Sequence, residues 1–164
     1  MRRRTVLRLG TATLAAPLVL GTPGTGTAQA APLAIRGVDL SSVPKAEDLG
    51  AVFAYADGTP GDPVLILRDG GANWVRLRVW VDSADGYHGR DQILAMGERA
   101  AAAGMSLLVD FHYSDTWADP GKQYKPAAWA NYNVNQLRDA VYNHTYDVLS
   151  ALKAQGKIGR ASCR

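Results

Sequence analysis

Aromatic and polar residues are interspersed between Ser114 and Trp129, and these residue types suit the binding of a sugar. Trp117, Tyr124 and Trp129 occur there among polar side chains, and Trp80 ends an earlier apolar run. The flat face of an aromatic ring matches the apolar C–H face of a sugar ring, while polar neighbours can bind its hydroxyls. Each tryptophan taken alone fits a core residue equally well. As a group, they predict a sugar-binding surface.

Charged residues alternate with apolar ones in three short runs. Arg76 and Arg78 share one face of the second run, Asp39 lies in the first, and Asp110 and His112 lie in the third. Burying an arginine is costly unless it meets a carboxylate. We therefore expect Asp39 and Asp110 to pair with the two arginines.

The histidines and the single cysteine do not form a metal-binding pattern. His112 suits a metal ligand, a general base or a hydrogen-bonding partner of a substrate, but no HxH or HExxH pattern accompanies it. His88, in a glycine-flanked turn, and His144, in a helical segment, are expected at the surface. One cysteine excludes a disulfide framework, and no GxGxxG, P-loop or GxSxG pattern occurs. We expect no metal and no cofactor.

Strands that alternate with helices must position these side chains. Alternation predicts strands over 36–41, 74–80 and 107–113, and helical spacing predicts helices over 62–70, 89–104 and 134–156. Such an order implies parallel βαβ connections. Central strands of a doubly wound sheet are apolar on both faces, whereas barrel strands direct polar side chains inward at their carboxyl ends. The α/β fold is therefore predicted to be a (β/α)₈ TIM barrel, and the alternative is an open sheet whose edge strands carry buried ion pairs.

The positive charge of the chain belongs to its two ends. The sequence has 18 Lys and Arg against 15 Asp and Glu, a net charge of +3. Four arginines lie in residues 1–30 and three bases in residues 157–164, which leaves 11 bases against 15 acids between them. This mildly acidic body gives no support to a nucleic-acid partner.

Residues 1–30 have the layout of a secretory signal peptide. A basic start is followed by an apolar run over residues 12–20, too short to span a membrane, and by a small-residue site at residues 28–30 (AQA). Residues 3–7 (RRTVL) also resemble a twin-arginine signal, so Sec and twin-arginine export both stay open. We expect cleavage after Ala30 and a secreted, extracellular bacterial protein with no membrane attachment.

Three motifs resemble glycoside hydrolase family 53, the arabinogalactan endo-β-1,4-galactanases. They are GVDLSS at 37–42, VRLRVW at 75–80 and DFHYSDTWADPGKQ at 110–123, and the resemblance extends over about residues 35–156. It implies a barrel that cleaves β-1,4-galactan internally with retention of configuration, as a monomer when full length. Residues 31–156 then form about three βα units, the N-terminal portion of that barrel.

The resemblance also implies roles for particular residues. The two catalytic glutamates of the family follow the fourth and seventh strands. Glu47, expected before the first helix, and Glu98, within a helix, are the only glutamates here. We therefore expect no catalytic residue, no fourth strand after Gly156 and no activity from this chain. Arg78 is expected to orient the nucleophile, His112 to line the subsite at the scissile bond, and Asp39 and Asp110 to anchor the network. The predicted substrate-binding residues are Asp39, Arg78, Trp80, His112, Tyr113 and Trp117.

Residues 157–164 depart from the family pattern. Their sequence, KIGRASCR, can be written in codons as a common sequencing adapter, which predicts a non-native tail. Two other functions remain open for the whole chain. One is another retaining TIM-barrel glycosidase of the mannanase or xylanase type, and the other is a non-catalytic sugar-binding domain.

Overall fold

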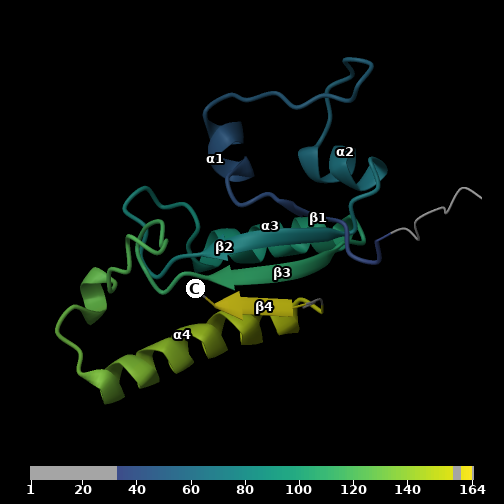
Figure 1. Ribbon diagram of the computed structural model, residues 1–164. Helices are drawn as coiled ribbons and strands as arrows, with labels where there is room; N and C mark the ends of the chain where they lie inside the picture. The colour runs from purple at the N-terminus through teal and green to yellow at the C-terminus, as the bar shows by residue number, and fades with distance from the viewer. Residues whose placement is uncertain (1–32, 157–159, 164) are drawn as a thin grey trace, which may run out of the picture. The chain divides into compact units, whose positions relative to one another are not determined.

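Four parallel strands form one sheet whose order follows the chain (Figure 1). The computed structural model describes residues 33–156 and 160–163. The strands are β1 (Gly37–Asp39), β2 (Trp74–Val79), β3 (Ser106–Phe111) and β4 (Arg160–Cys163). All three pairings, β1 with β2, β2 with β3 and β3 with β4, are parallel. Sequential parallel strands with helices between them are the arrangement from which a (β/α)₈ barrel is built.

Local sequence explains where the helices begin and end. They are α1 (Val43–Asp48), α2 (Pro63–Asp69), α3 (Arg90–Ala102) and α4 (Val134–Ala154), with a 3₁₀ turn η1 at Ala127–Trp129. Asp62 caps α2 by accepting a hydrogen bond from the Val64 N–H, and Asn133 and Gln136 form a capping box at α4. Gly104, with a φ of +74°, follows the C-cap of α3. The three predicted helices and three predicted strands are confirmed.

The core lies between β2, β3 and the helices α3 and α4. Helix α3 lies behind the sheet in Figure 1 and packs on β2 and β3. Val75, Leu77 and Val79 share the apolar face of β2, and each is at most 1% exposed. Residues of α3 and α4 complete this buried cluster, among them Ile93, Met96, Ala100, Val148 and Leu152. The opposite face of the strands is therefore left for the polar residues.

Helix α1 corrects the expectation that Glu47 precedes the first helix. Glu47 lies inside α1, where both its carboxylate oxygens accept hydrogen bonds from Arg99 of α3 (2.7 and 2.9 Å). Arg99 also binds Asp62 at 2.9 Å. A helix of six residues is too short to show a helical period, and its place is determined by this tertiary contact.

Strand β4 shows that the expectation of no fourth strand was wrong. Residues 160–163 pair with Leu108 to Phe111 of β3. Parallel pairing uses backbone N–H and C=O groups, which every residue of this segment carries, so it depends little on side-chain type. The predicted signal over residues 1–30 lies outside the described residues. The non-native origin of residues 157–164 stays a prediction.

His88 and His144 are not surface residues, contrary to expectation. His88 is 5% exposed, has a φ of +64° and packs its ring 4.4 Å from that of Trp80. His144 is half-buried beside the rings of Phe111 and Trp129. Burial lowers the pKa of both imidazoles, and the nearby Arg78 lowers that of His88 further. Within the part of the chain that the structure describes, no helix has the length and apolar character of a membrane span.

At Gly97, helix α3 packs closely against Leu152 of α4. A Cβ added there would lie 2.8 Å from Cδ2 of Leu152, a side chain that is 1% exposed. We expect Gly97→Ala to lower the free energy of unfolding by ~1 kcal/mol, because overpacking outweighs the gain in helix propensity. In a Leu152→Ala background the same change should raise it. Urea denaturation of the four proteins measures both, and stabilisation in both backgrounds would contradict this packing.

Candidate functional site

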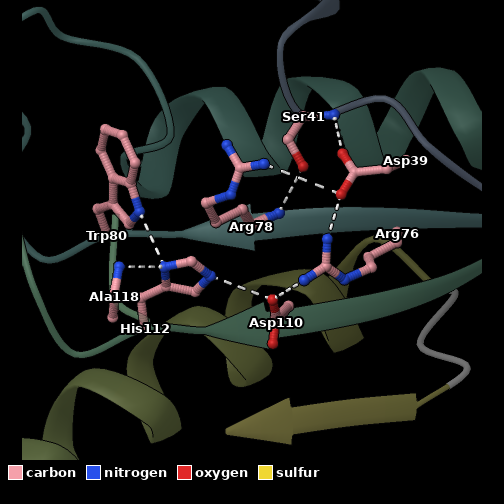
Figure 2. Close-up of polar contacts among 8 residues, drawn as sticks. All are labelled: Asp39, Ser41, Arg76, Arg78, Trp80, Asp110, His112 and Ala118. Atoms are coloured by element: carbon pink, nitrogen blue, oxygen red, sulfur yellow. Dashed lines mark hydrogen bonds and ion pairs between the residues drawn. The ribbon is translucent and has the colours of Figure 1, made fainter. Parts of the chain in front are cut away.

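The polar residues of the three strands meet at the carboxyl edge of the sheet (Figure 2). The register places Asp39 of β1 beside Arg76 of β2, and Arg78 of β2 beside Asp110 of β3. Alternation directs these side chains to the face opposite the core. Strand pairing thus brings together residues that are far apart in the sequence.

Arg76 joins the three strands at this edge. Its Nη1 donates to Oδ2 of Asp39 and its Nη2 to Oδ2 of Asp110 (Figure 2). The Asp110 side chain is 1% exposed, so its charge depends on these partners. Arg78 Nη2 lies 3.9 Å from the same Asp39 oxygen. The predicted pairing of the arginines with Asp39 and Asp110 is confirmed.

Ser41 completes this network, and the sequence analysis did not single it out. Its backbone N–H donates to Oδ1 of Asp39 (2.9 Å), and its Oγ accepts from the backbone N–H of Arg78 (2.9 Å). Burial by itself raises the pKa of Asp39, but hydrogen bonds from Ser41 and Arg76 outweigh it and hold the pKa below its usual value. The Asp-Leu-Ser order, typical of an Asx turn, was the available signal.

His112 links the charged residues to the aromatic ones. Its Nδ1 lies 3.3 Å from the indole nitrogen of Trp80 and 3.3 Å from the backbone nitrogen of Ala118. Both of these groups are N–H donors, so Nδ1 accepts and Nε2 carries the proton. Nε2 then donates to Oδ2 of Asp110 at 3.2 Å. The His112 side chain is fully buried, and its hydrogen bonds define a neutral imidazole.

Trp117 is the aromatic residue that this edge presents to solvent. The guanidinium carbon of Arg78 lies 3.4 Å from the centroid of its ring, and the ring of Trp80 lies 6.2 Å away. Trp117 is 49% exposed, whereas Trp80 is 6% exposed. Arg78 thus supports Trp117 by a cation–π contact, while Trp80 contributes mainly packing and its hydrogen bond to His112.

The structure brings five of the six predicted substrate-binding residues together and places the sixth elsewhere. Tyr113, with a φ of +47°, stacks on Phe111 and forms a hydrogen bond with Oγ1 of Thr145 in α4 (2.8 Å). Of the other loop aromatics, Tyr124 is 65% exposed, but Trp129 is 8% exposed and packs as a core residue. The five that meet are Asp39, Arg78, Trp80, His112 and Trp117.

Metal coordination finds no support at this edge. Among residues 33–156 and 160–163, no group of three or more His, Cys, Asp or Glu side chains is arranged to hold a metal ion. The carboxylates of Asp39 and Asp110 instead bind Arg76.

Polar and aromatic residues at the carboxyl ends of sequential parallel strands occupy the place where barrel enzymes have their active sites. Residues 35–160 match glycosyl hydrolase family 53, and the chain belongs to that family. Its predicted fold class, an α/β N-terminal portion of a (β/α)₈ TIM barrel, is confirmed by solved structures of the family.

Named relatives agree with this assignment. The arabinogalactan endo-β-1,4-galactanase of Thermothelomyces thermophilus is 43% identical over 124 residues, 76% of this chain and 37% of the relative. The arabinogalactan endo-β-1,4-galactanase A of Emericella nidulans is 40% identical, over 74% of this chain and 35% of the relative. The chain therefore spans about a third of the length of the curated relatives it matches.

Two solved structures resemble the fold. One, from a study of two fungal β-1,4-galactanases, is 40% identical with a TM-score of 0.75 and covers 79% of this chain and 39% of its own. The family 53 catalytic domain of Ignisphaera aggregans is 40% identical with a TM-score of 0.69. The match covers 76% of this chain and 37% of that domain.

Acid should remove the contribution of Asp39 to stability. Its folded-state pKa is lowered, so the contribution is complete above the unfolded value of about 3.9 and is lost as the pH falls through the folded value. We expect the difference in unfolding free energy between wild type and Asp39→Asn to stay constant from about pH 7 to 5 and to shrink below about pH 4. Urea unfolding across this range measures it. A difference that does not change down to about pH 2 contradicts the assigned network.

Proposed function

We propose that this chain is part of a secreted endo-β-1,4-galactanase, which hydrolyses the β-1,4-galactan of arabinogalactan internally with retention. Family membership and galactanase relatives at 40–43% identity support this. The observation that carries it is Trp117, half-exposed and stacked on Arg78 at the carboxyl edge of the sheet, where barrel enzymes bind substrate. The neutral polysaccharide is the only partner proposed, and the mature enzyme is an extracellular bacterial monomer without a cofactor.

The catalytic carboxylates are proposed to come from further sequence. Retaining hydrolysis needs a nucleophile and an acid/base about 5 Å apart. Glu47 binds Arg99 on α1, and Glu98 belongs to α3, away from the strand ends. Asp39 and Asp110 bind Arg76. Both oxygens of Asp39 and Oδ2 of Asp110 already accept hydrogen bonds from the protein, so these two residues belong to the supporting network.

The described residues then prepare the site for these carboxylates. Arg78, immobilised on Trp117, presents a cation at the strand ends where a nucleophile carboxylate would be oriented. His112 lines the same edge in its neutral form, held by Asp110, and Trp80 is held by His112. Trp117 stacks against a galactose ring. Tyr113 contributes less directly, through the position of α4.

The gene sequence beyond the codon for Gly156 tests the proposed origin of the catalytic residues. We expect genomic sequencing to show an open reading frame that encodes a strand ending in Asn-Glu, since the relatives are about three times as long as the matched segment. Genomic reads that run through residues 157–164 without a break and then stop would contradict both the proposed extension and the adapter origin of the tail.

Activity on purified polysaccharides tests the substrate. The product of the complete gene should release oligosaccharides from β-1,4-galactan with retention, observed by NMR of the fresh products, while the 164-residue chain should show no turnover. Preference for mannan or xylan would identify another retaining glycosidase. Galactan binding by the 164-residue chain, with no hydrolysis by the complete product, would identify a sugar-binding domain.

Removal of the Trp117 ring should weaken substrate binding. In the product of the complete gene, we expect Trp117→Ala to raise KM for galactan about tenfold, the change that corresponds to ~1.4 kcal/mol of lost stacking. Tyr142→Ala, which removes an exposed aromatic ring from α4, is the control and should leave KM unchanged. Equal effects of the two substitutions would remove Trp117 from the site.

A further inference from the structure

Asp115 joins two loops at the carboxyl edge of the sheet. Its Oδ1 accepts a hydrogen bond from the backbone N–H of Asp82, in the β2–α3 loop, at 3.0 Å. Its Oδ2 accepts from the backbone N–H of Ala127, the first residue of η1, at 2.8 Å. Both carboxylate oxygens are therefore used, and each bonds a different segment of the chain. Hydrogen bonds to a charged acceptor are the stronger kind.

These contacts continue the pairing of β2 and β3 beyond the strand ends. The His112 N–H donates to the carbonyl of Val79 (3.0 Å), and the Val81 N–H donates to the carbonyl of Ser114 (2.9 Å). Asp115 adds the next link and, by reaching Ala127, closes the intervening loop into a ring. The base of the loop that carries Trp117 is thereby fixed to the neighbouring loop.

Trp117 lies between two anchors of this loop. Asp115 is two residues before it, and Ala118, whose N–H donates to His112, directly follows it. The far end of the loop has its own attachment, because Pro126 and Trp129 are buried. Asp115 is therefore not required to keep η1 in the core. Its two bonds determine where the loop begins relative to β2, and so where Trp117 meets Arg78.

We infer that Asp115 is a positioning residue for galactan binding, which it serves by holding the ring of Trp117 on the guanidinium of Arg78. This rests on the proposed function. Asp115 does not touch the sugar itself, and its effect passes through the backbone of residues 115–118. A loop that is ordered before binding loses less conformational entropy when the substrate binds. The loss of Asp115 should therefore appear in KM rather than in kcat.

Substitution in the complete gene product tests this inference. We expect Asp115→Ala to raise KM for β-1,4-galactan about tenfold, with kcat within about twofold and an unchanged pH profile of kcat. Asp115→Asn keeps one acceptor oxygen and should fall between this variant and the wild type. Amide exchange at Asp82 and Ala127 should become faster in Asp115→Ala, and the emission of Trp117, obtained by difference from Trp117→Phe variants, should change.

Asp119 offers a matched control within the same loop. Its Oδ1 bonds only the nearby N–H of Gly121 (2.8 Å), and Lys122 lies 3.9 Å from its Oδ2 in an exposed pair. Asp119→Ala and Asp119→Asn remove the same charge and should leave KM, both amides and the Trp117 emission unchanged. Faster exchange in Asp115→Ala without a change in KM overturns the positioning role, as does a fall in kcat alone. If wild type fails to cleave galactan, the proposed function fails, and exchange and emission still decide whether Asp115 positions Trp117.

Discussion

The double ion pair of Arg76 is the interaction on which the site depends. Three parallel strands place charged side chains on one face, and two of the charges, Asp110 and Arg78, are buried. A buried charge is stable only when it is paired and hydrogen-bonded. Arg76 meets this need for Asp110 and also binds Asp39, whose Oδ2 lies 3.9 Å from Nη2 of Arg78. The two arginines and two aspartates of this network balance in charge.

The same network extends from ions to aromatic rings. Asp110 fixes the tautomer of His112, and the unprotonated nitrogen of His112 holds both Trp80 and the backbone at Ala118. The position of Trp117, in the loop after β3, is thus set by polar contacts that begin at Arg76 of β2. A half-exposed ring that stacks on a guanidinium needs such support, because stacking is directional, whereas hydrophobic packing alone is not.

Sequence periodicity predicted the strands, the faces they bury and the residues that pair across them. The alternation in β1, β2 and β3 predicted both the strands and the partners of Arg76, because register follows from which face is apolar. The same alternation puts Tyr113 on the face of Phe111, so its contact with α4 was open to prediction. The burial of His88 and His144 was not, since it depends on rings brought from distant segments. Helix α1 was not predicted for a similar reason, because its position depends on the contact of Glu47 with Arg99 of α3.

The pairing of β4 with β3 is made through backbone groups. Residues 161–163 lie beyond the family match, which ends at residue 160, yet they complete a ladder with Val109 to Phe111. An unpaired edge of this kind is open to an extended segment from a neighbouring polypeptide and is a point of strand exchange and aggregation. Covering this edge therefore protects against misassembly, whichever segment provides the cover.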